Sequence, residues 1–173
     1  MKNSTKKIAR SALFGALYYV ITLAIYPFSF GPVQFRVSEA LCILPLFFPE
    51  SVWGITIGCL LSNVFSSTNP ILDVPLGTSA TFLACTTTYL LSKICKNDIT
   101  RILSAILPCI LYNAFIVPFS FYAISELSQM YFWGVIQVGL GQLGVCCIVG
   151  IPLYFILKKR IKLFENTQNR YKQ

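Results

Sequence analysis

The sequence predicts an all-α integral membrane protein with six transmembrane helices, and three observations support this fold class. Apolar residues make up 55% of the 173 residues, while charged residues make up only 12%. The mean hydropathy is +0.69, a balance that a soluble domain with a polar surface does not sustain. The basic residues gather at the two chain ends and in one short loop, as the positive-inside rule describes.

The length of the chain limits the number of crossings. A helix needs about 20 residues to cross a hydrocarbon core of ~30 Å, so the chain accommodates about six helices and no extramembrane domain. We therefore expect a single membrane domain over residues 1–173. The apolar runs predict helices at approximately 8–30, 39–48, 51–66, 76–94, 101–123 and 131–157.

The first helix carries a face of small residues. The stretch "ARSALFGALYY" places Ala9, Ala12, Gly15 and Ala16 on one side. Small residues let another helix approach closely, so internal packing and docking of a membrane partner both fit this face. The run is longer than a signal-peptide core and no A-x-A-like cleavage site follows it, so we expect it in the mature protein.

The second and third apolar runs form either one long helix broken at Pro45 and Pro49 or a hairpin around "FFPES". Two helices place the N-terminal basic cluster, "KICKNDITR" and "KKRIK" on one side of the membrane, whereas one helix would separate them. We therefore predict a multi-pass plasma-membrane protein with both termini in the cytoplasm. Lipid headgroups then account for the net charge of +8, and no nucleic-acid partner is expected.

In this topology Arg36 is the one basic residue on the outer side. The second helix that follows it is too short to span the membrane alone, so the preceding loop is expected to dip inward. Irregular backbone at that depth is tolerated where protein covers it or a water-filled cavity receives it. This loop therefore resembles a wall or lid of an outward-facing cavity.

Arg36 and Glu39 are the first candidates for a binding site, since they lie three residues apart at the start of the second helix. An ion pair at the membrane interface is one interpretation. The other is a ligand path, because an ionisable residue at membrane depth costs about 2.5–3.5 kcal/mol on insertion scales and usually has a function. A carboxylate there suits a neutral or cationic ligand with paired N–H donors.

Few other polar side chains occur within the apolar runs. Asp73 also fits a helix-start or turn residue, and Trp133 offers a stacking surface but also fits an interfacial anchor. The stretch "GLGQLG" lies within the last apolar run and follows no strand, so it is not a nucleotide-binding loop. The further candidate binding residues are Asn63, Asp73, Asn113, Trp133, Gln137 and Gln142.

Enzymatic and metal chemistry find little support in the sequence. The chain has no histidine, and its seven cysteines form no C-x-x-C motif. The cysteines fit small buried residues. We therefore expect no catalytic residue, metal or cofactor, and no enzyme activity in this chain.

Several stretches resemble one family, the QueT family of queuosine-precursor transporters. They are "VQFRVSEAL", "GCLLSNVFSSTNPILDVPLGTSATFLA", "ALFGALY" and "GIPLYFIL", and the likeness covers essentially the whole chain. The resemblance implies the fold of a substrate-binding S-component of an energy-coupling factor (ECF) transporter. Such a component binds a small molecule from outside, while a transmembrane coupling protein and two ATPases drive its release inside. ATP hydrolysis is then expected on those partners.

The resemblance also gives the candidate residues roles. A 7-deazaguanine such as queuine or its aminomethyl precursor presents a ring N–H beside an exocyclic amine, which one carboxylate can accept with two hydrogen bonds. We assign that role to Glu39 and a supporting role to Arg36, with Asn63, Asp73 and Gln142 completing the polar edge. The last helix reads Gly141-Gln142 where the family leads us to expect glycine and glutamate, which changes an acceptor into a mixed donor and acceptor.

Two other classes of protein remain open from the sequence. A solitary facilitator or small multidrug exporter would transport without a coupling module, and its acidic residue would relay protons. A membrane enzyme would need a catalytic cluster that this sequence does not contain.

Overall fold

The computed structural model describes residues 2–29, 35–66, 70–120 and 128–170. These residues contain helices and no strand, which confirms the expected all-α class. Three helices in the described part are long and apolar enough to cross a membrane, namely Ser4–Ala24, Asp98–Ile116 and Met130–Leu163. The apolar helices Val37–Leu46 and Ser51–Phe65 are shorter. Six crossings therefore stay a prediction.

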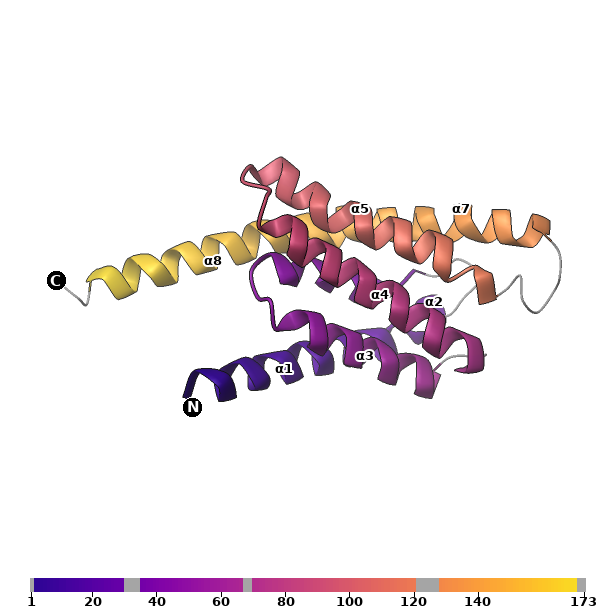
Figure 1. The fold of residues 1–173 in the computed structure, drawn as a ribbon, viewed down its shortest axis with the longest axis horizontal. Coiled ribbons are helices and arrows are strands. Elements are labelled where there is room, and N and C mark those ends of the chain that lie inside the picture. The colour runs from indigo at the N-terminus through magenta and orange to yellow at the C-terminus, as the bar shows by residue number, and fades with distance from the viewer. Residues whose placement is uncertain (1, 30–34, 67–69, 121–127, 171–173) are drawn as a thin grey trace.

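The helices lie side by side along the long axis of the molecule (Figure 1). Neighbours in space follow the chain order, since α1 packs on α3, α3 on α4, α4 on α5 and α5 on α7. Both chain ends lie at the same end of the molecule (Figure 1). The elements are α1 (Lys2–Ala24), α2 (Tyr26–Ser29), η1 (Val37–Leu46), α3 (Ser51–Ser66), α4 (Pro70–Ser92), α5 (Asp98–Ile116), α7 (Ser128–Val145), η2 (Cys146–Gly150) and α8 (Ile151–Arg170).

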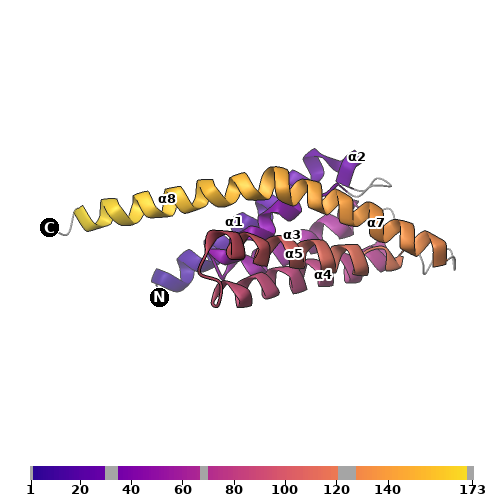
Figure 2. The same cartoon turned by 90° about the horizontal axis from the view of Figure 1, so that it is seen from above.

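The last predicted helix is longer than expected. Helices α7 and α8 join through η2, a short π-helical segment, into one continuous rod that extends past the bundle at its C-terminal end (Figure 2). The extension beyond residue 157 carries the basic cluster that begins at Lys158. The fall in hydropathy after residue 157 therefore marks the end of the apolar segment and not the end of the helix. The backbone hydrogen bonds of α8 continue through the polar residues that follow.

The second predicted helix is a 3₁₀ helix, η1, that lies inside the bundle. Every residue from Ser38 to Leu46 is buried, and η1 contacts α1, α3, α4, α5, α7, η2 and α8. A helix that is apolar on all sides is stable only when protein surrounds it. The η1 element is therefore the centre of the fold, around which the longer helices are arranged.

Close approach of α1 and α3 depends on glycines. A Cβ atom at Gly54 would lie 2.0 Å from the carbonyl oxygen of Ser11, and one at Gly58 would lie 2.5 Å from the carbonyl oxygen of Gly15. No side chain fits at these separations, so the two backbones touch directly. The position of α1 is thus set by its contact with α3.

Charged side chains form contacts near the beginnings of α1, α3 and α5 and in α8. Arg10 pairs with Glu50 at 3.4 Å, and Lys158 pairs with Asp98 at 2.5 Å. Arg101 donates a hydrogen bond of 2.8 Å to the carbonyl oxygen of Leu46. These contacts join α1 to the turn before α3, α5 to η1, and α8 to α5.

Candidate functional site

The carboxylate of Glu39 lies at the centre of the bundle and is 0% exposed. Its Oε1 accepts hydrogen bonds from the Tyr18 hydroxyl at 2.5 Å and the Thr81 hydroxyl at 2.9 Å. Its Oε2 accepts one from the Cys42 thiol at 3.1 Å and a longer one from the Asn113 amide at 3.5 Å. Oε1 is therefore held by two hydroxyl donors, whereas Oε2 receives weaker contacts, which come from the Asn113 amide and from two thiols, Cys109 at 3.7 Å being the second.

Arg36 is also buried, with 1% of its surface exposed. It interacts electrostatically with both Glu39 and Asp73. The protein covers both side chains, so an ion pair between them would be a buried one. Burial of both charges indicates a site inside the bundle.

Asn63, Arg36 and Asp73 converge near Gly77 of α4. A Cβ atom at Gly77 would lie 2.7 Å from Nδ2 of Asn63 and 3.4 Å from Nη1 of Arg36. Asp73 lies one turn before Gly77 and is 8% exposed. Gly77 therefore leaves the space that these polar side chains occupy beside α4.

Two buried amide groups leave acceptors available. The Oδ1 atoms of Asn63 and Asn113 are buried and have no hydrogen-bond partner within the described residues. Gln142 is 1% exposed, and its Oε1 receives a long contact of 3.9 Å from the Cys109 thiol. A buried acceptor without a partner costs about 1–3 kcal/mol, so a bound ligand with N–H donors would stabilise this arrangement.

Two of the predicted binding residues lie elsewhere. Trp133 is 62% exposed, and Gln137, one turn further along α7, is also exposed. The structure therefore brings Glu39, Asn113 and Gln142 together and places Trp133 and Gln137 on the outer surface of α7. Helix α7 is apolar on nearly every side, so its sequence did not indicate which side faces inward.

Two residues in the centre were not predicted from the sequence, Tyr18 and Thr81. Both are 0% exposed and donate to Glu39. Tyr18 lies in an apolar run beside Tyr19, and Thr81 lies in a segment with several other hydroxyl residues. No local signal distinguishes them, because their role comes from contacts with a distant part of the chain.

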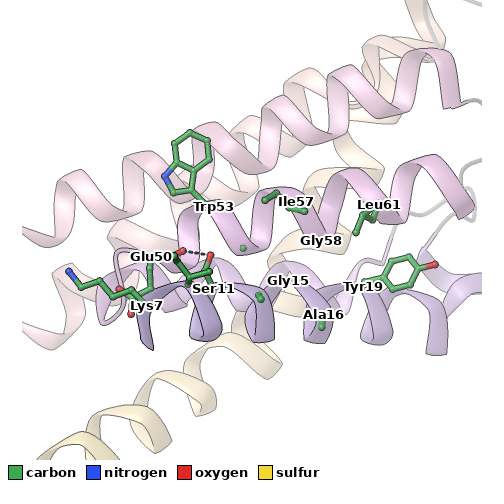
Figure 3. Close-up of a pocket in the computed structure, with 13 residues that line it drawn as sticks. Lys7, Ser11, Gly15, Ala16, Tyr19, Glu50, Trp53, Ile57, Gly58 and Leu61 are labelled. Atoms are coloured by element: carbon green, nitrogen blue, oxygen red, sulfur yellow. Dashed lines mark hydrogen bonds between the residues drawn. The ribbon is translucent and has the colours of Figure 1, made fainter. Parts of the chain in front are cut away.

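The small-residue face of α1 borders an open groove between α1 and α3 (Figure 3). The groove has a volume of about 610 Å³, and Ala12, Gly15 and Ala16 line it from α1. Ala9, Ala12 and Ala16 are exposed, whereas Gly15 is buried against Gly54. The face thus divides into one residue that packs internally and three that are accessible.

A bundle of apolar helices around a buried polar centre is the architecture of a membrane transport or receptor protein. The family model described as "QueT transporter" matches residues 8–159. The chain belongs to the QueT transporter family.

Comparison with curated proteins gives a relative from Lactococcus lactis subsp. cremoris (strain MG1363), named queuosine precursor transporter QueT. The two are 35% identical over 99 residues, which cover 56% of this chain and 57% of the relative. The match therefore spans a little over half the length of that protein. No solved structure matches the chain.

Proposed function

We propose that this transporter is the substrate-binding S-component of an ECF importer and that it takes up a queuosine precursor. The observation that carries the proposal is the buried carboxylate of Glu39 beside amide acceptors that lack partners, in a chain of the QueT transporter family. The name of the Lactococcus lactis relative supports the choice of substrate class. The site is built for a ligand that donates hydrogen bonds, as the guanine-like edge of a 7-deazaguanine does.

In this proposal Oε2 of Glu39 accepts hydrogen bonds from the substrate, because Oε1 already accepts hydrogen bonds from the hydroxyls of Tyr18 and Thr81. The ring N–H and exocyclic amine of the substrate would donate to Oε2 in place of the Asn113 amide, whose contact is long, and would compete there with the Cys42 thiol. The free Oδ1 atoms of Asn63 and Asn113 would accept further donors. Arg36 and Asp73 would close the outer side of the site, and Gln142 would contact the base from α7.

The partners in this proposal are a transmembrane coupling protein and two ATPases. The accessible face formed by Ala9, Ala12 and Ala16 supports it, because small residues beside a groove allow a helix of another protein to approach closely. A solitary facilitator or small multidrug exporter is the alternative, and such a protein would need no docking face of this kind.

One experiment separates these functions. Mass spectrometry of small molecules that copurify with the detergent-solubilised protein is expected to identify a 7-deazaguanine. Uptake of that compound into cells is expected only when the coupling protein and ATPases are coexpressed. A bound compound of another class would contradict the substrate, whereas uptake without the coupling module would contradict the S-component role.

The topology gives a second expected result. Cysteine introduced at Asn97, in the loop between α4 and α5, should be labelled only after the membrane is opened, whereas cysteine at Ile71 should be labelled from outside intact cells. Both positions are exposed on the protein. Serine replacements of Cys95 and Cys147 give a sufficient background, because the other five cysteines are buried.

Labelling of position 97 from outside would contradict the prediction of cytoplasmic termini and six crossings. Six crossings would also place the loop near Glu126 outside the cell, and that loop lies outside the described residues.

A further inference from the structure

A small cavity of about 10 Å³ lies inside the bundle, next to Glu39. Glu39, Cys42, Cys109 and Cys146 line it, so one carboxylate and three thiols surround a space about the size of a single water molecule or ion. All four residues are buried. Carboxylate and thiol groups in this number are the ligands that zinc and related soft divalent ions take in proteins.

Local backbone structure explains why these side chains meet. In a 3₁₀ helix the side chains of residues three apart are eclipsed, so η1 places Glu39 and Cys42 on the same side. Cys146 is the first residue of the π-helical segment η2, and π-helical turns often occur at functional sites. Cys109 lies on α5, which packs against both η1 and η2. Two departures from regular α-helix thus meet at the cavity.

The distances fit a tetrahedral ion. The ligand atoms of Glu39, Cys42 and Cys109 lie within 4.8 Å of one another. Oε2 of Glu39 is 3.1 Å from the Cys42 sulfur and 3.7 Å from the Cys109 sulfur. Zinc bonds of ~2.0 Å to oxygen and ~2.3 Å to sulfur require a separation of ~3.5 Å between the two ligand atoms in tetrahedral geometry.

The geometry points to a zinc site in the substrate-free protein, with Oε2 of Glu39 and the sulfurs of Cys42 and Cys109 as ligands and Cys146, as a neutral thiol, lining the cavity beside them. Binding releases the protons of the Cys42 and Cys109 thiols to solvent, because zinc binds thiolates. The divalent ion together with the guanidinium of Arg36, which interacts electrostatically with Glu39, balances the charge of two thiolates and one carboxylate.

The other carboxylate oxygen supports such a site. Tyr18 and Thr81 both donate to Oε1, which fixes the orientation of the carboxylate and directs Oε2 toward the thiols. Hydrogen bonds of this kind to a metal-binding carboxylate change metal affinity about 10–100-fold. The inference does not depend on the transport role, although a substrate that binds Oε2 would exclude the ion.

Zinc alone, added to purified and chelator-treated full-length protein in detergent without substrate, tests the site. We expect one zinc per chain, with X-ray absorption showing sulfur ligands at ~2.3 Å and an oxygen ligand at ~2.0 Å. Cys42→Ser and Cys109→Ser should each lower zinc affinity by at least the ~10–100-fold that is typical of lost supporting contacts. Cys147→Ser is the matched control, since Cys147 is exposed and adjacent to Cys146, and it should retain wild-type affinity.

Wild-type protein that binds no stoichiometric zinc would overturn the inference. So would an absorption spectrum without sulfur ligands, which needs no variant and therefore stands even where a serine replacement impairs folding. Equal loss of zinc in the Cys147→Ser control would place the ion elsewhere. None of these measurements uses substrate or coupling protein, so their failure leaves the proposed function untouched.

Discussion

Replacement of Ala16 by tryptophan is expected to abolish ATP-dependent uptake while the isolated protein still binds substrate with nearly wild-type affinity. Ala16 is exposed and lines the groove between α1 and α3 (Figure 3). An indole there would fill the groove from outside and hold a partner helix away from the small-residue face. Glu39 belongs to η1 and accepts a hydrogen bond from Tyr18 on the side of α1 that faces the bundle interior. The substitution of Ala16 should therefore leave the binding site unaffected.

Copurification with the coupling protein and uptake in cells measure the docking effect, and titration of the purified protein measures substrate binding. Leu13→Trp is the matched control, because Leu13 is an exposed residue of the same helix that does not line the groove. Ala12→Trp should behave as Ala16→Trp does. Loss of substrate binding in both groove variants would mean that this face packs within the protein.

Gly15 offers a useful contrast on the same helix. A Cβ atom at this position would lie 2.6 Å from the carbonyl oxygen of Gly54, so even alanine would separate α1 from α3. Loss of function at Gly15 therefore reports on folding, and only the exposed alanines report on docking.

Glu39→Gln is expected to weaken binding of queuine or its aminomethyl precursor at least tenfold. The amide lacks the charge and places an N–H donor against a site that already contains the donors of Tyr18, Thr81 and Cys42. Hydrogen bonds to a charged group contribute ~1.5–3 kcal/mol, and the unpaired donors add to the loss. A difference of ~1.4 kcal/mol corresponds to a tenfold change in dissociation constant.

Calorimetric titration of the purified variants measures this effect. Glu50→Gln is the matched control, because Glu50 pairs with Arg10 and lines the groove along α1 and α3 rather than the cluster around Glu39. Arg36→Ala should cost less than Glu39→Gln and should change the dissociation rate more than the association rate, since we assign Arg36 a supporting role beside the carboxylate. A folded Glu39→Gln protein with wild-type affinity would move the site to Asn63, Asp73, Asn113 and Gln142.

The sequence alone was sufficient for the class of protein and for the buried residues with charged or amide side chains, but not for the buried hydroxyl residues. Composition and hydropathy depend only on which residues are present, and they identified a helical membrane protein. Polar side chains are so rare in the apolar runs that Glu39, Asn63 and Asn113 could be selected without knowledge of the fold. All three are buried in the structure, and the high cost of burying such groups explains why rarity is a useful signal.

The tertiary structure decided how those residues are arranged. Three of the donors to Glu39, namely Tyr18, Thr81 and Asn113, lie 21, 42 and 74 residues away along the chain, in α1, α4 and α5. Periodicity within a segment describes neighbours up to about one or two helical turns away, so it contains no information about such contacts. For the same reason the sequence did not separate Gln142, which faces inward, from Gln137, which faces outward on the same apolar helix. The 3₁₀ geometry of η1 likewise depends on the helices that surround it, because an isolated segment of ten residues has too few internal hydrogen bonds to choose its own form.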